Sequence, residues 1–205
     1  MNARHVSLFG SGREDRHGGA QPFVWAGLAL IVGLVIWGVS LNNSLVRADE
    51  GVSNAWANVE TVLQRRYDLI PNLVNTVKGY AAHEKELFAE VTRLRSQWSA
   101  AGTVAEKAEA AGQLEGAIGR LLLVAENYPD LKASENFRGL QHELAGTENR
   151  ISVERRRYNE AVRTYNTKVR QFPASIIAGL RGFAPNDAYF EADDKAKDAP
   201  KVDFE

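Results

Sequence analysis

The chain has 205 residues, of which 44% are hydrophobic and 25% are charged, and its 25 basic side chains nearly balance 26 acidic ones. This balance provides no strong field for a nucleic acid, so we expect no nucleic-acid partner. The sequence contains no cysteine, which excludes disulfides, thiolate metal sites, cysteine nucleophiles and a lipid-modified cysteine anchor.

The N-terminal region combines a polar tail with a long apolar run. Residues 1–22 are polar, rich in glycine and without periodicity, so we predict a disordered tail. An uncharged run then begins at Phe23 and ends at Leu41. As a helix it would extend roughly 28 Å, close to the ~30 Å hydrocarbon core of a bilayer. The run therefore predicts a transmembrane helix in contact with lipid; a cleaved signal peptide and a buried soluble helix are the alternatives.

The charges on either side of this run bear on its orientation. Three arginines precede it, at positions 4, 13 and 16, whereas Arg47 is the nearest basic residue after it. The positive-inside rule therefore favours the tail in the cytoplasm and the large domain outside.

Four amphipathic helices are predicted beyond the apolar run. Apolar residues recur there at three- and four-residue spacing in segments that begin at Val52, Ile70, Val104 and Phe137, and no segment keeps a two-residue period. We predict an all-α fold: an N-terminal transmembrane helix (residues 23–41) followed by an antiparallel four-helix bundle (residues 42–185). Residues 186–205 are acidic and aperiodic, which is typical of a flexible tail.

The boundaries between these helices are predicted from turn and capping residues. The tract Ala101-Gly102-Thr103 separates the second helix from the third, and Thr103 with Glu106 has the spacing of a capping box. The tract Tyr128-Pro129-Asp130 separates the third helix from the fourth, which Phe172-Pro173 ends or bends.

The stretch RRYDLIPNLV, residues 65–74, predicts the first reversal of the bundle. Pro71 has no amide hydrogen, and its ring clashes with the carbonyl four residues earlier in a helix. Asp68 can accept hydrogen bonds from freed amides as an N-cap. We therefore expect one helix to end near Tyr67 and the next to begin around Leu69.

Several tracts of this chain resemble the LemA family of bacterial membrane proteins. They are RRYDLIPNLV, YPDLKA, ELAGTENRI and YNEAVRTYN, within a match over about residues 42 to 190. The resemblance implies an N-terminal membrane helix, an antiparallel helical bundle and the bacterial cytoplasmic membrane. It supplies no established activity, although some members are associated with magnetosome formation or membrane proteases. It also implies a bundle inside the cell, opposite to the charge count, so the side of the membrane stays open. The tyrosines and prolines of these tracts read as structural motifs: Tyr67, Pro71, Tyr128, Pro129, Tyr158 and Tyr165.

A search for catalytic and metal-binding patterns finds none. A di-metal bundle site needs Glu-x-x-His on two helices, but Tyr80 and Gly139 stand three residues before His83 and His142. The run that begins at His83 lacks the second histidine of a zinc protease motif. We therefore predict a protein that is not an enzyme, with no catalytic residue, no metal and no cofactor.

Charged residues occupy positions of the helical repeats where apolar residues are expected. We call the following set the polar seam: Arg65, Arg66, Asp68, Glu84, Glu115, Glu148 and Arg155. If these side chains face inward, they would fix the register of the bundle or line a ligand pocket. If each helix is slightly rotated, they reach water at the bundle edge. Tyr158 and Tyr165, each followed by asparagine, form a further stripe that is more typical of core and rim than of a binding site.

Two functions are consistent with these features. The first is a membrane-anchored scaffold or adaptor that organises other membrane or envelope proteins, which the sequence does not identify; a homo-oligomer is a further option. The second is a membrane-tethered sensor that binds a small ligand at the polar seam. We favour the scaffold, because a sensor needs an output domain or a second membrane helix.

Overall fold

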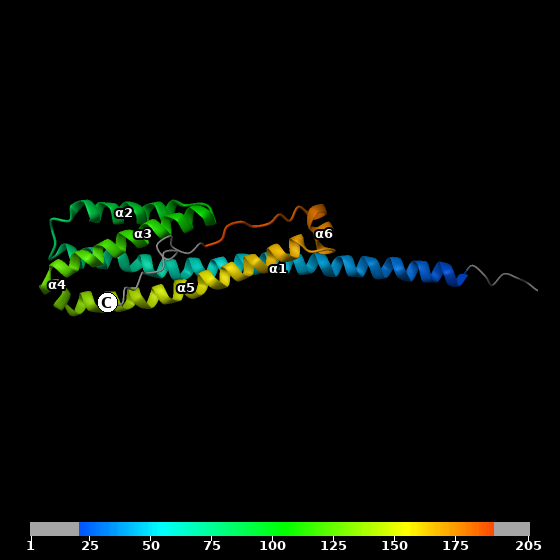
Figure 1. The fold of residues 1–205 in the computed structure, drawn as a ribbon, viewed down its shortest axis with the longest axis horizontal. Coiled ribbons are helices and arrows are strands. Elements are labelled where there is room, and N and C mark those ends of the chain that lie inside the picture. Colours follow the sequence, from blue (N-terminus) through cyan, green and yellow to red (C-terminus); the bar gives the residue numbers. More distant parts are fainter. Residues whose placement is uncertain (1–20, 191–205) are drawn as a thin grey trace, which may run out of the picture.

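The computed structural model describes residues 21–190, and every regular element in that range is a helix (Figure 1). This confirms the predicted all-α class. The predictions of a disordered tail before residue 21 and a flexible tail after residue 190 fall outside the described residues. The elements in chain order are α1 (Gln21–Lys78), α2 (Lys85–Ala100), α3 (Val104–Val124), the 3₁₀ helix η1 (Ala125–Asn127), α4 (Pro129–Ala133), α5 (Glu135–Arg170) and α6 (Ala174–Arg181).

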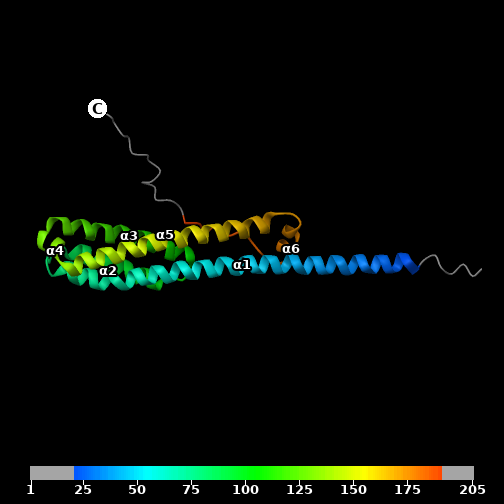
Figure 2. The same ribbon diagram turned by 90° about the horizontal axis from the view of Figure 1, so that it is seen from below.

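The long helices form an antiparallel bundle, as predicted. α1 and α5 lie side by side along the longest interface of the molecule, and α2 and α3 form a second pair (Figures 1 and 2). We call the end of the bundle next to residues 23–41 proximal and the opposite end, where α1 ends, distal. α2 and α3 cover only the distal half, because they are much shorter than α1 and α5.

The apolar stripes of these helices make one continuous core. Its largest fully buried side chains include Leu63 and Ile70 of α1, Leu94 of α2, Leu114 of α3 and Tyr158 of α5. Removing a side chain of this size from water contributes ~1.5 to 3 kcal/mol. The core extends along α1 from Leu45, which is fully buried, toward its distal end.

The predicted helix break at residues 67–69 is wrong, because α1 continues through Pro71 to Lys78. Proline leaves the carbonyl of Tyr67 without its usual amide donor. The Nε of Arg95, on α2, donates to this carbonyl at 3.3 Å and replaces that donor. Asp68 is not an N-cap; its carboxylate accepts a hydrogen bond of 2.8 Å from Gln64 on the preceding turn of the same helix.

The first reversal of the bundle lies at residues 79–84, within the stretch predicted as the second helix. After Lys78 the amides of Tyr80 and Ala81 both donate to the carbonyl of Val77, at 3.0 and 2.8 Å, and the chain turns into α2 at Lys85. The other three predicted boundaries agree with the structure. Thr103 and Glu106 form the capping box, Pro129 begins α4, and α5 ends two residues before Phe172.

α6 and an extended segment complete the described chain. Gly182, with φ of +78°, ends α6 in a left-handed conformation that glycine adopts without steric cost. Residues 183–190, which we call the strap, then run back along the bundle (Figure 1). The predicted domain boundary at residue 185 therefore moves to at least residue 190, because the strap packs on the core through Phe183 and Phe190.

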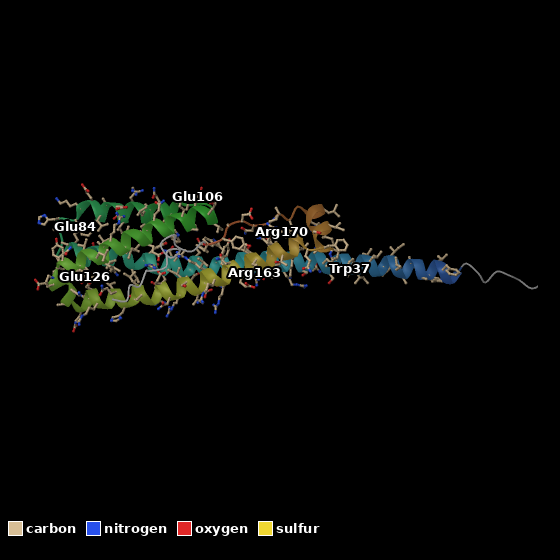
Figure 3. The ribbon with its side chains drawn as sticks, viewed as in Figure 1. Trp37, Glu84, Glu106, Glu126, Arg163 and Arg170 are labelled. Carbon is tan, nitrogen blue, oxygen red and sulfur yellow. The ribbon has the colours of Figure 1, made fainter. Side chains whose placement is uncertain are left out.

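The N-terminal part of α1 projects from the bundle. Within residues 21–190, α1 alone is long and apolar enough to cross a membrane, with a mean hydropathy of 2.3 in its apolar part. Side chains such as Leu30 and Trp37 are exposed there (Figure 3). The apolar run and the first helix of the bundle are thus one uninterrupted helix.

Candidate functional site

Four residues of the polar seam come together in the distal half of the bundle. Arg66 of α1 forms an ion pair with Glu148 of α5. Arg155, also on α5, places its Nη2 3.4 Å from Oε2 of Glu115 on α3. We call this group the charge cluster. It connects three of the four long helices.

The cluster is partly buried, and its most buried member is Arg66. The Arg66 side chain is 9% exposed, whereas its partner Glu148 is 38% exposed and reaches water. Burial lowers the pKa of Arg66, which the nearby Glu115 carboxylate opposes. The guanidinium of Arg66 thus faces inward, while the carboxylate of Glu148 lies at the edge of the bundle.

The charge cluster contains two cations and two anions, so its charges cancel. It offers no excess charge to an ionic ligand. Its Arg66 and Arg155 Nε atoms are nevertheless buried without a hydrogen-bond partner among the described residues. The arrangement can fix the register of α1, α3 and α5, because sliding any helix by one turn would separate the paired charges.

The other three seam residues lie outside the charge cluster. Arg65 is exposed and lies 4.0 Å from Glu143 at the bundle surface. Asp68 is exposed beside Gln64. Glu84 lies in the turn before α2, at the distal end of the molecule (Figure 3). Its placement on the seam assumed a helix across residues 79–84, where the structure has a turn.

The predicted motif tyrosines are mostly structural. The ring of Tyr67 packs edge-on against Trp98 with centroids 4.6 Å apart, and burial raises the pKa of this tyrosine. Tyr158 is buried beside Trp56, with centroids 5.6 Å apart. Tyr128 immediately precedes α4 and packs against the core.

Two asparagines of α5 hold the strap through paired hydrogen bonds. The Nδ2 of Asn166 donates to the carbonyl of Asn186 at 2.7 Å, and its Oδ1 accepts from the Asn186 amide at 2.8 Å. Asn159 makes the same pair of bonds with Phe190, at 2.8 and 2.9 Å. We call these two arrangements the asparagine clamps. Each side-chain amide satisfies both polar groups of one backbone residue, as a neighbouring strand would.

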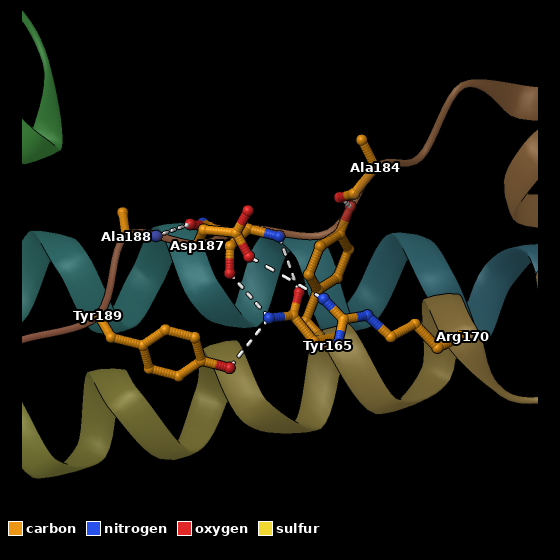
Figure 4. Close-up of polar contacts among 8 residues, drawn as sticks. Tyr165, Arg170, Ala184, Asp187, Ala188 and Tyr189 are labelled. Atoms are coloured by element: carbon orange, nitrogen blue, oxygen red, sulfur yellow. Dashed lines mark hydrogen bonds and ion pairs between the residues drawn. The ribbon is translucent and has the colours of Figure 1, made fainter.

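Tyrosines reinforce the clamp at Asn166. The hydroxyl of Tyr165 donates to the carbonyl of Ala184 at 2.9 Å, and Asn166 also donates to the hydroxyl of Tyr189 (Figure 4). The sequence shows two Tyr-Asn pairs, at residues 158–159 and 165–166, but it does not indicate what they bind. Their seven-residue separation was the available signal, since it places both asparagines on one face of a helix.

The strap reaches the charge cluster through Phe190. Its ring stacks on Trp56 with centroids 6.0 Å apart, and the Arg155 guanidinium lies 5.1 Å from its centroid. The asparagine clamp at Asn159 and the charge cluster are therefore neighbours. Within residues 21–190, no three histidine, aspartate or glutamate side chains gather in a metal-binding group.

Comparison with known proteins identifies several relatives of this chain. The magnetosome protein MamQ 1 of Paramagnetospirillum magneticum is 27% identical over 186 residues, covering 78% of this chain and 68% of the relative. MamQ of Magnetospirillum gryphiswaldense is 25% identical, covering 73% and 64%. Protein LemA of Metamycoplasma hominis is 27% identical over 141 residues, covering 68% and 64%. The LemA family model matches residues 55–204, which include α2 to α6 and most of the bundle part of α1. The chain therefore belongs to the LemA family.

Proposed function

We propose that this chain is a single-pass protein of the bacterial cytoplasmic membrane that acts as a scaffold or adaptor for other membrane or envelope proteins. The observation that carries this proposal is the continuity of α1. One helix joins the exposed apolar run to the distal end of the bundle. From Asn42 to Lys78 it extends about 55 Å. A bundle built on such a helix holds its distal surfaces at a set distance from the bilayer.

The surface of the bundle supports binding to proteins in preference to catalysis. The described charged residues are distributed over all four long helices, and many lie in ion pairs such as Arg120 with Glu90 and Arg163 with Glu160. The charged side chains of the charge cluster form ion pairs that connect one helix to another. The relatives named as magnetosome proteins are consistent with a role in membrane organisation.

Site-specific photo-crosslinking in the native bacterium tests the scaffold. A photoreactive residue replaces one exposed side chain at a time: Arg93 on α2, Leu123 on α3 or Arg156 on α5. We expect a discrete adduct with the same membrane protein from one or two of these positions and none from the others. Random background or no adduct at every position would overturn the proposal.

A matched control separates the bundle from the apolar run. Residues 23–41 are replaced by an unrelated apolar helix of equal length, which leaves α1 continuous. The adducts should persist, because the proposal assigns partner contact to the bundle. Their loss would assign that contact to the apolar run.

A small ligand at the charge cluster is the second candidate function. The unpartnered Nε atoms of Arg66 and Arg155 favour it. The double variant Arg66→Met/Glu148→Leu replaces the ion pair by apolar side chains of similar size, which buried pairs tolerate well. If this folded variant keeps the wild-type crosslinking pattern, the cluster serves the fold alone.

A further inference from the structure

The surface around α6 carries an unusual concentration of exposed apolar side chains. Beyond residues 23–41, seven large apolar residues are exposed among those described, and three of them lie in or next to α6. Phe172 is 76% exposed, Ile176 56% and Leu180 82%. Ile176 and Leu180 lie one turn apart on the same side of α6, and Phe172 lies in the turn just before the helix. We call these three residues the apolar stripe.

The opposite side of α6 is also apolar. Ala178 is buried and Ile177 packs against the core. The Cδ1 atom of Ile177 lies 3.9 Å from the position that a Cβ on Gly38 would take, so α6 rests directly on α1. A helix that is apolar on both sides has no face suited to water. The apolar stripe therefore calls for an apolar neighbour.

The position of α6 identifies that neighbour. α5 runs antiparallel to α1, and Nζ of Lys168 lies 3.0 Å from Oγ of Ser44. Phe172 follows two residues after the end of α5 at Arg170, and the uncharged run ends at Leu41, three residues before Ser44. Gly38, which α6 contacts, lies inside that run. In Figure 1, α6 lies beside α1 where the bundle ends and the projecting part of α1 begins.

Basic side chains border the apolar stripe. Lys168 and Arg170 lie in the last turn of α5, and Arg181 ends α6. Trp37, on the neighbouring turn of α1, is 52% exposed (Figure 3). Tryptophan beside lysine and arginine is the composition found at the interface between a bilayer and water.

We propose that α6 is an interfacial helix whose apolar stripe inserts into the bilayer beside the membrane-spanning part of α1. The bundle then contacts the membrane at two places, through α1 and through α6. This inference rests on the proposed function, because it requires residues 23–41 to cross the bilayer. Its occupant is lipid, and the stripe lies at the depth where acyl chains meet head groups.

Spin labels on single cysteines test the insertion, since the chain has no cysteine of its own. The full-length protein is labelled at Ile176→Cys or Leu180→Cys and reconstituted in phospholipid nanodiscs. Leu123→Cys is the matched control, because Leu123 is 67% exposed but lies on α3 at the distal end. Leu30→Cys reports on the apolar run itself. Circular dichroism first verifies that each variant is folded.

Collisions with molecular oxygen, which concentrates in lipid, are compared with collisions with a water-soluble nickel chelate. At positions 176 and 180 we expect oxygen accessibility to exceed nickel accessibility several-fold, with the reverse at position 123. Nickel accessibility at 176 and 180 equal to that at 123 would overturn the insertion, while a lipid signal at position 30 would leave the anchor standing.

Two further outcomes would also overturn the proposal. Shielding of positions 176 and 180 from both reagents, with spin–spin broadening, would mean that a second copy of the chain covers the stripe. Water exposure at position 30 would overturn the membrane anchor and, with it, the insertion of α6.

Discussion

The distal and proximal halves of the bundle pack the same two helices in different ways. In the distal half, α2 and α3 cover the α1–α5 pair with apolar stripes such as that of Leu114 and Leu121. In the proximal half, the strap and α6 cover it. The distal half follows from periodic apolar residues, whereas the proximal half depends on side-chain amides that bind backbone. A bundle with two short helices can thus be completed by an irregular segment if that segment's polar groups are satisfied.

The largest expected effect tests whether both halves are equally well packed. Leu45 and Leu121 are fully buried in the proximal and distal halves, respectively. Each change to alanine should lower the free energy of unfolding by about 3 kcal/mol, through lost burial and the cavity that remains. Thermal melts followed by circular dichroism in detergent micelles measure both. A loss below ~1 kcal/mol for Leu45→Ala alone would show a loosely packed proximal half. The exposed Leu123→Ala is the control.

Two variants of the charge cluster test how much its ion pairs stabilise the distal half. Arg66→Ala should cost about 2 kcal/mol, less than the roughly 3 to 5 kcal/mol of a fully buried pair, because Glu148 still reaches water. Arg155→Ala should cost no more than about 1 kcal/mol, because both members of its pair are partly exposed, and salt should reduce this loss. Chemical denaturation at low and high salt measures both variants. Equal, salt-sensitive losses would mean that Arg66 is not buried.

Two variants at Asn166 test how much an asparagine clamp stabilises the proximal half. Asn166→Leu removes both hydrogen bonds to Asn186 and should cost about 1 to 2 kcal/mol. Asn166→Asp keeps an acceptor for the Asn186 amide but turns a carboxylate oxygen toward the Asn186 carbonyl at a buried position, so its effect should be at least as large. Hydrogen exchange followed by mass spectrometry should show faster exchange in the strap and unchanged protection in α2 and α3. Unchanged exchange in the strap of the leucine variant would contradict the clamp.

The smallest expected effect concerns the connection between α1 and α2. Arg95→Ala leaves the Tyr67 carbonyl without its donor and should cost about 1 kcal/mol. In a Pro71→Ala background the restored amide donates to that carbonyl, so the same change should cost almost nothing. A double-mutant cycle measures the coupling. Equal costs in both backgrounds would mean that Arg95 does not compensate for the proline.

The sequence predicted the helices whose apolar spacing is sustained, and it missed contacts made across the chain. α3 followed from its apolar spacing and its capping box, and α5 followed from its apolar spacing. Pro71 misled the prediction because the donor that compensates for it, Arg95, lies 28 positions from Tyr67, whose carbonyl it binds. No local rule for proline includes such a donor.

The residues of the candidate site, like the helices, were only partly predictable from the sequence. Four of the seven seam residues meet, because they lie on helices with regular spacing. Glu84 does not, because the spacing was extended through a turn. The strap was missed because Asn159 and Asn166 bind backbone groups of Phe190 and Asn186. Every residue carries such backbone groups, so they leave no signature in a sequence.

The uninterrupted α1 also has a mechanical consequence. Helices that cross a bilayer are tilted from the membrane normal by about 20° on average. Because no flexible joint separates the apolar run from the bundle, the same tilt would swing Lys78 sideways by about 19 Å over the ~55 Å length of the helix. The molecule would act as a lever, in which a change in the tilt of the apolar run becomes a large displacement of the far end of the bundle.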